Sequence, residues 1–205
     1  MALSQGKRRE ITMYSFRNDY SEGAHPKVLQ ALADTNLRQT VGYGMDPCCQ
    51  AAADTIRRLC AAPDAAVHFL VGGTQVNLVT IDAFLQSYEA VVAAQTGSVS
   101  THETGAIEAT GHKVCTVESP DGKLTPALVE SVLAGHNGTE HMVLPRMVYI
   151  SDTTEIGTVY TRAELAALRQ CCDVHGLFLY LDGARLGSAL TSPDNDLTLP
   201  DLAAP

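Results

Sequence analysis

Residues 161–182 read TRAELAALRQCCDVHGLFLYLD and predict a helix followed at once by a buried strand. Thr161 is followed three residues later by Glu164, a capping box that predicts the start of a helix over 161–176. The strand, LFLYLD at 177–182, is almost purely apolar, which is typical of a sheet that is covered on both faces. This segment therefore indicates a parallel sheet enclosed by helices.

The same alternation of strand and helix extends upstream to residue 66. Further apolar runs predict strands at 66–71, 89–94, 112–118 and 146–151. Helices are predicted at 25–39, 48–60, 74–86, 102–110 and 125–135. This order predicts an α/β fold with a mainly parallel sheet and helices on both faces.

The length of 205 residues fits one large domain. We expect residues 1–13 to form an N-terminal tail and residues 14–205 to form the domain. The chain holds 14 basic and 23 acidic residues, a net charge of −9, which argues against binding to nucleic acid or to an anionic membrane. The apolar runs are also too short to span a bilayer.

The spacing of cysteines and histidines gives no sign of disulfides or of a metal site. The six cysteines include two adjacent pairs, and neither CxxC nor HExxH occurs in the sequence. No apolar stretch follows the basic residues of the N-terminus, so no secretory signal is visible. We therefore expect reduced thiols, no bound metal and a cytoplasmic location.

A possible phosphate-binding turn follows the strand predicted at 66–71. Ligands of parallel sheets bind beyond the carboxyl ends of the strands. Gly72, Gly73 and Thr74 lie there, where glycines let the backbone approach an anion and the first N–H groups of a helix point toward it. A plain strand-to-helix turn is the alternative. The GxGxxG fingerprint of dinucleotide sites and the Walker A loop are both absent.

Three more side chains at this edge have a chemical use. His102 can stack on a flat ring, or be a surface or capping histidine. Asp182 ends the strand 177–182, where a carboxylate needs a cationic partner such as a protonated ring nitrogen, or caps the next helix. Arg185 can hold a carboxylate with two hydrogen bonds, or pair with Asp182. Together with the glycine turn, these groups match the tasks of a protein that binds pyridoxal 5'-phosphate (PLP).

Five stretches, taken in order, resemble one known family. They are FRNDYSEGAHPKVLQAL, VGYGMDP, GGTQVN, HETGAIEATGHKV and LYLDGARLGSAL. They resemble the threonine aldolase / aromatic amino acid beta-eliminating lyase family of fold-type I PLP-dependent enzymes, over most of residues 14–192. The resemblance implies that residues 14–205 are a PLP-binding large domain, incomplete at its C-terminal end and without the family's C-terminal small domain.

The resemblance also implies roles for individual residues at the cofactor. Gly73 and Thr74 would hold the phosphate, His102 would stack on the pyridine ring, and Asp182 would pair with the ring nitrogen. His102 and Asp182 are the expected catalytic residues.

Three further residues are expected to meet the substrate. Arg185 and Asn18 would lie near the substrate carboxylate. Tyr43 would reach a neighbour's site, because members of the family are usually homodimers or homotetramers.

One feature of the family is missing from the sequence. These enzymes hold PLP as a Schiff base on a lysine beyond the aspartate strand, but no lysine follows Asp182. The four lysines of the chain are Lys7, Lys27, Lys113 and Lys123. We therefore expect this chain to be the N-terminal part of a longer enzyme, cut before its catalytic lysine.

The function that the resemblance implies is cleavage of a small amino-acid substrate. The expected reaction converts a β-hydroxy amino acid, such as L-threonine, to glycine and an aldehyde. The alternatives are a PLP-dependent β-eliminating lyase, an aminotransferase, or a catalytically inactive fragment of such an enzyme.

Overall fold

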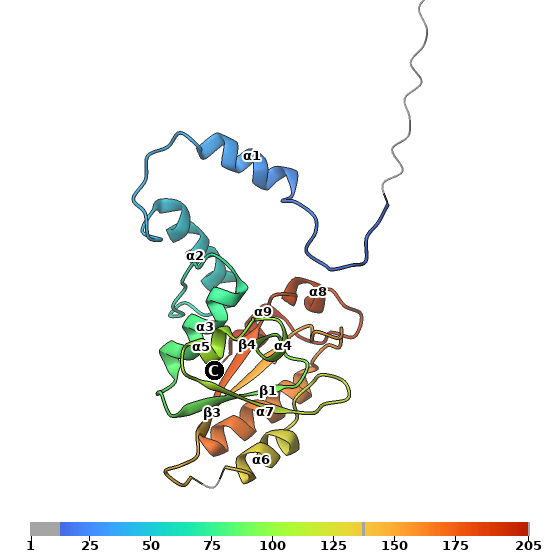
Figure 1. Ribbon diagram of the computed structural model, residues 1–205. Helices are drawn as coiled ribbons and strands as arrows, with labels where there is room; N and C mark the ends of the chain where they lie inside the picture. The colour runs from blue at the N-terminus through green and yellow to red at the C-terminus, as the bar shows by residue number, and fades with distance from the viewer. Residues whose placement is uncertain (1–12, 137, 205) are drawn as a thin grey trace, which may run out of the picture. The chain divides into compact units, whose positions relative to one another are not determined.

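The computed structural model describes residues 13–136 and 138–204 (Figure 1). It divides into two compact units, one ending at Gly42 and one beginning at Tyr43. The tail predicted over 1–13 lies, apart from Met13, outside the described residues. The second unit contains the sheet.

The first unit contains helix α1 (Pro26–Thr35). Pro26 occupies the first helical turn, as the sequence predicts, and His25 Nδ1 accepts a hydrogen bond from the backbone N–H of Lys27 at 3.2 Å. The helix ends at Thr35 rather than at residue 39, so Leu37 lies beyond it.

A parallel sheet forms the centre of the second unit. Its strands are β1 (Glu89–Ala94), β2 (Lys113–Val117), β3 (Leu144–Ser151) and β4 (Phe178–Asp182). Their order within the described residues is β2-β1-β3-β4, and every neighbouring pair is parallel. At the carboxyl end of this sheet Ser151 pairs with Asp182, so the ends of β3 and β4 are level.

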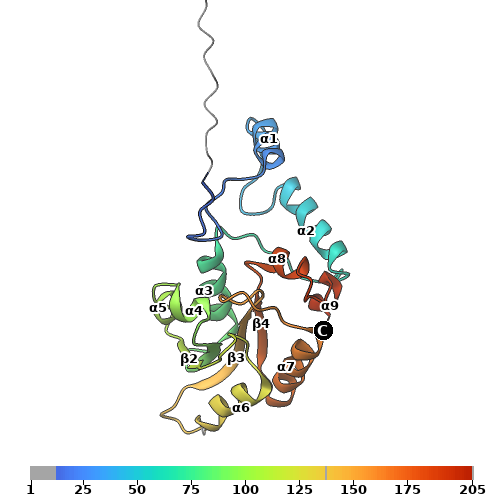
Figure 2. The same cartoon turned by 90° about the vertical axis from the view of Figure 1, so that its right-hand side faces the viewer.

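Helices cover both faces of the sheet, as predicted (Figure 2). On one face, α3 (Gly73–Phe84), α4 (Ser98–Thr101) and α5 (Ala106–Ala109) contribute Ile81, Val99 and Ile107 to a buried apolar cluster. On the other face, α6 (Pro126–Ala134) and α7 (Arg162–His175) contribute Val129 and Leu168. The remaining helices of this unit are α2 (Pro47–Leu59), α8 (Leu186–Leu190) and α9 (Leu199–Ala203). The fold class predicted from the sequence is therefore confirmed.

The predicted helix caps are also confirmed. Thr161 accepts from the backbone of Glu164, and the Glu164 side chain accepts from the backbone of Thr161, so the capping box is complete. The hydroxyl of Thr125 caps α6 by accepting from the backbone N–H of Leu128, with Pro126 in the first turn. Helix α7 stops at Gly176, whose φ of +64° is the left-handed geometry that glycine adopts without strain.

Two predicted elements differ in the structure. The strand predicted at 66–71 is wrong, because this segment pairs with no other strand in the part of the chain described, and its Phe69, Leu70 and Val71 are exposed. A strand needs a hydrogen-bonded neighbour, which apolar composition alone does not supply. Of the helix predicted at 102–110, only the short helix α5 (Ala106–Ala109) forms, and α4 (Ser98–Thr101) ends before the predicted start. Thr104 and Gly105, with φ of +50° and +76°, separate them.

The C-terminal residues form helices that the sequence analysis did not identify. Arg162, at the start of α7, donates to both carboxylate oxygens of Asp201 in α9, at 2.6 and 2.7 Å. This bidentate pair joins α9 to the first turn of α7. Among the described residues, no helix is both long and apolar enough to cross a membrane.

Candidate functional site

Asp182 lies at the carboxyl end of β4 and is held there by three uncharged donors. The hydroxyl of Tyr149 donates to Asp182 Oδ2 at 2.7 Å, and the side-chain amide of Asn77 donates to the same oxygen at 3.0 Å. The backbone N–H of Ala184 donates to Oδ1 at 2.9 Å. These donors carry no charge, and they fix the orientation of the carboxylate. Asp182 does not cap the next helix, because the N-cap of α8 is Arg185.

Asn77 links three parts of the fold to Asp182. It lies in α3, one turn after Gly73, and is 2 % exposed. Its Nδ2 donates to Glu103 Oε1 at 2.9 Å as well as to Asp182, and its Oδ1 accepts from the hydroxyl of Tyr180 at 2.7 Å. Both amide hydrogens and the carbonyl are therefore used, and the amide can take only one orientation.

The two tyrosines beside this amide keep their protons over a wide pH range. Burial raises the pKa of Tyr149, and the negative charge of Asp182 raises it further. Burial, followed by the charge of Asp182, raises the pKa of Tyr180 to about 12. The rings lie edge to face, 5.5 Å apart. Both hydroxyls are therefore donors at neutral pH.

A second set of hydrogen bonds attaches α4 to the end of β3. Ser151 donates to Glu155 Oε1 at 2.8 Å. The same carboxylate oxygen accepts from the backbone N–H and the hydroxyl of Ser98, at 2.6 and 2.8 Å. The start of α4, which leads to His102, is thereby fixed at the carboxyl edge of the sheet.

The glycine turn has the features of an anion-binding helix start. Helix α3 begins at Gly73 after the N-cap Gly72, and no described side chain caps it. A Cβ atom added at either glycine would meet no described atom within 4 Å. Gly73 and Thr74 are exposed. The first N–H groups of this 12-residue helix are thus open to a ligand.

His102 lies at the end of α4, not at the start of a helix as predicted. Its backbone N–H donates to the carbonyl of Ser98, and its side chain is exposed. The next residue, Glu103, is buried and bonded to Asn77. The backbone at His102 is therefore anchored one residue from the hydrogen bonds that hold Asp182.

The residues expected near the substrate are placed as follows. Arg185 is half-buried at the N-cap of α8, three residues beyond Asp182. Tyr43 is fully exposed in the loop before α2, with a φ of +65°. Asn18 belongs to the first unit, where its Oδ1 accepts from Tyr20 N–H and from the Ser21 hydroxyl. Their roles stay predictions.

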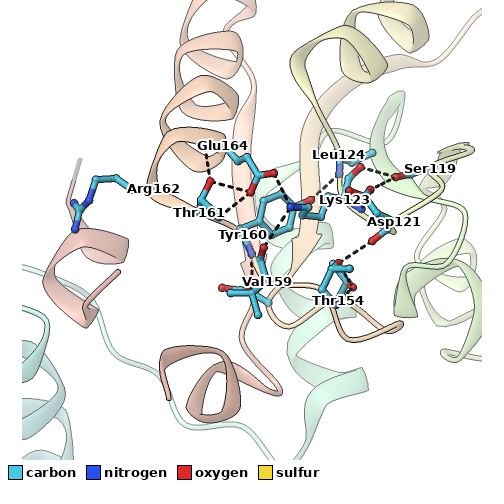
Figure 3. Close-up of polar contacts among 12 residues, drawn as sticks. Ser119, Asp121, Lys123, Leu124, Thr154, Val159, Tyr160, Thr161, Arg162 and Glu164 are labelled. Atoms are coloured by element: carbon cyan, nitrogen blue, oxygen red, sulfur yellow. Dashed lines mark hydrogen bonds and ion pairs between the residues drawn. The ribbon is translucent and has the colours of Figure 1, made fainter. Parts of the chain in front are cut away.

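Lys123, one of the four lysines of the chain, has a clear structural role (Figure 3). Lys123 Nζ donates to Glu164 Oε1 at 2.5 Å and to the carbonyl of Val159 at 3.3 Å. It also lies 5.8 Å from the centre of the Tyr160 ring, whose hydroxyl accepts from the backbone N–H of Leu124. Lys123 therefore fastens the loop before α6 to the first turn of α7.

The structure brings together Asp182, helix α3 with its glycine turn, and the segment that carries His102. The residues that join them, Asn77, Glu103 and Tyr149, were not predicted. The position of Asn77 one turn after Gly73–Thr74, on the buried face of a helix, is a signal that could have pointed to it.

Comparison with known proteins identifies the family of this chain. Residues 16–198 match the family described as beta-eliminating lyase. The chain belongs to the beta-eliminating lyase family. Two relatives called low specificity L-threonine aldolase, from Pseudomonas sp. (strain NCIMB 10558) and Pseudomonas aeruginosa, are 36 % and 35 % identical to it over 176 residues. The match covers 85 % of this chain but only 50 % of each relative, so the chain spans about half their length.

Solved structures of other proteins share the fold. A threonine aldolase from Leishmania major is 57 % identical, with a TM-score of 0.90 over 93 % of this chain and 55 % of that chain. An aminotransferase from Escherichia coli has a TM-score of 0.67 at 14 % identity, over 90 % of this chain and 45 % of that one. The second likeness shows the fold alone, which is that of the large domain of fold-type I enzymes.

Proposed function

We propose that this chain serves a PLP-dependent lyase that cleaves β-hydroxy amino acids, such as L-threonine, to glycine and an aldehyde. Three observations support the proposal: membership of the family, the relatives named threonine aldolases, and the geometry at the carboxyl edge of the sheet. The strongest support comes from the geometry of Asp182. Its carboxylate is fixed by uncharged donors at the edge where parallel sheets bind ligands.

The residues of the edge fit PLP. The cofactor carries a phosphate, a flat ring and a ring nitrogen that can be protonated. The uncapped glycine turn of α3 suits the phosphate, because its open backbone N–H groups attract an anion. Asp182 suits a protonated nitrogen, because a carboxylate that uncharged donors hold in place can pair with a cation.

The chemistry then divides between the cofactor and the protein. When bound, PLP supplies an electron sink for the negative charge left on the amino-acid carbon after the Cα–Cβ bond breaks. Asp182 keeps the ring nitrogen protonated, and Asn77 and Tyr149 keep Asp182 in place. Gly73 and Thr74 bind the phosphate.

The remaining predicted residues act on the ring and on the substrate. His102 stacks on the ring and is a candidate base for the substrate hydroxyl. Arg185 binds the substrate carboxylate, and the same role for Asn18 stays an expectation from the family resemblance. Tyr43 enters the site of a second subunit in a homodimer or homotetramer.

Product analysis tests this function in the full-length gene product. With PLP and L-threonine, the proposal predicts glycine and acetaldehyde in equal amounts. β-Elimination, which the name of the family favours as a second candidate, would instead yield a keto acid and ammonia. Transamination would yield a keto acid and an aminated cofactor. Absence of glycine above the reaction of free PLP would contradict the aldolase proposal.

A further inference from the structure

A cluster of three metal-ligating side chains lies between α6 and α7, apart from the carboxyl edge. Glu130 comes from α6, and Cys171 and His175 come from α7. One ligand atom from each, a carboxylate oxygen, the sulfur and a ring nitrogen, all lie within 4.8 Å of one another. We propose that these three side chains form a binding site for one zinc ion.

The backbone places the three ligands on facing surfaces. Cys171 and His175 are four residues apart, so they lie on the same side of α7, as do the two zinc-binding histidines of the HExxH motif. Glu130 faces them from α6. Val129 and Cys172, next to two of the ligands in sequence, are fully buried in one apolar cluster. The two helices are therefore held together by the core, whether or not a metal is present.

The chemistry of the donor set selects zinc. Thiolate, imidazole and carboxylate are the side chains that bind zinc in proteins, whereas magnesium and calcium prefer sites made of oxygen alone. A thiolate and a carboxylate carry two negative charges, which balance the charge of the ion. His175 lies in the last turn of α7, where the partial negative charge of the helix end favours a cation.

The burial of the ligands lets the site close on an ion. Cys171 is 6 % exposed, while the side chains of Glu130 and His175 are 60 % and 37 % exposed. His175 Nε2 and Glu130 Oε1 are 3.8 Å apart. Zinc–ligand bonds are about 2.0 to 2.3 Å long, so rotation of the two exposed side chains would complete the site, with water as the fourth ligand.

The simpler alternative is that Glu130 and His175 form an ion pair next to the buried Cys171. This alternative predicts that no metal ion binds at stoichiometric concentration. The sequence patterns for zinc missed the cluster because one ligand comes from a second helix. Exposed Cys48 and the neighbouring Cys49 could bind metal elsewhere, so the test must separate the two places.

Titration of the reduced, metal-free full chain with Co²⁺, followed by displacement with Zn²⁺, tests the proposal. A thiolate ligand gives Co²⁺ a charge-transfer absorption band. We expect one ion per chain, and a band that disappears when Zn²⁺ is added.

Glu130 and His175 are exposed, so they can be replaced without disturbing the core. We expect His175→Gln to weaken binding of Co²⁺ by at least about 100-fold, since even partners outside the ligand shell are worth 10- to 100-fold. Glu130→Gln should weaken it too, and Cys171→Ser should abolish the band. The exposed residues His141 and Glu140 supply matched controls, because His141→Gln and Glu140→Gln should bind as the unchanged protein does.

Three results would overturn the site. They are absence of the band at one equivalent, unchanged affinity in His175→Gln, and loss of the band in a Cys48→Ser/Cys49→Ser variant. The last result would move the binding to the N-terminus of α2.

Discussion

Asp182 is oriented by side chains from other elements, Asn77 on α3 and Tyr149 on β3. The Asn77 amide is also bonded to Glu103, whose second oxygen, Oε2, is buried without a hydrogen-bond partner among the described residues. The amide lies between the two carboxyl groups and donates one hydrogen to each. Asn77 is therefore a positioning residue for the proposed cofactor site.

Replacement of Asn77 by leucine should reduce activity without unfolding the protein. Leucine has the same branching of side-chain heavy atoms but donates no hydrogen bond, so Asp182 loses one of its donors and Glu103 loses the amide that donates to it. In the full-length gene product, we expect kcat/KM for L-threonine to fall roughly 10- to 100-fold, the range for outer-shell partners of a catalytic group. PLP affinity, measured by absorbance titration, should fall as well.

The control for this experiment removes a bond on the other side of the amide. Tyr180→Phe deletes the hydroxyl that donates to Asn77 Oδ1 but leaves both amide hydrogens in place. We expect a smaller loss. If Asn77→Leu had the same activity and PLP affinity as the unchanged protein, Asn77 would be a packing residue only.

At the scale of elements, the sequence predicted helix starts correctly but did not predict which strands pair. Thr161 with Glu164, and Thr125 with Pro126, predicted the starts of α7 and α6, because a cap is formed by residues close in sequence. The run 66–71 looked like a strand, but pairing depends on a distant segment that composition does not reveal. The contact between Asn77 and Asp182 spans 105 residues, so it too could be found only from the fold.

The Lys123–Glu164 pair makes a prediction about pH. Burial alone would raise the pKa of Glu164, but hydrogen bonds from Lys123 and Thr161 outweigh it and hold the pKa below the ordinary value of 4.5. A lowered pKa in the folded state stabilises the protein above pH 4.5, and this contribution is lost as the pH falls through the folded pKa.

We therefore expect Lys123→Met to lower the free energy of unfolding by about 1 kcal/mol or less at pH 7. The difference from the unchanged protein should shrink as the pH is lowered from 7 toward 3, because the contribution is lost as Glu164 becomes protonated. Denaturant unfolding at both pH values measures it. A difference that is the same at pH 3 and pH 7 would show that Lys123 acts through packing on Tyr160 instead.

At the scale of the whole molecule, alternation of apolar runs and helices was enough to predict the parallel sheet and its two covered faces. The edge rule for parallel sheets also pointed to Asp182, at the end of β4. The glycine turn was predicted from a strand at 66–71 that does not form, although α3 and Asn77 do connect that turn to Asp182. The sequence alone could not show which side chains orient Asp182, because that depends on how α3 packs on β4.

Labelling of lysines tests the placement of the site within the chain. Lys113 begins β2, at the end of the parallel sheet opposite to Asp182, and Lys123 is bonded to Glu164. We expect residues 1–205, mixed with PLP and reduced with borohydride, to show no stoichiometric label on a single lysine by mass spectrometry. A clean label on Lys113 or Lys123 would mean that the cofactor binds elsewhere.

The most direct test of the proposed cofactor site is the rate of glycine formation from L-threonine by Asp182→Asn in the full-length gene product. Asparagine keeps the shape of the side chain but has no charge to hold the ring nitrogen protonated. We predict that kcat falls at least about 100-fold, as for other fixed electrostatic groups, while the circular dichroism spectrum is unchanged. A variant that folds, binds PLP and forms glycine at the unchanged rate would contradict the account.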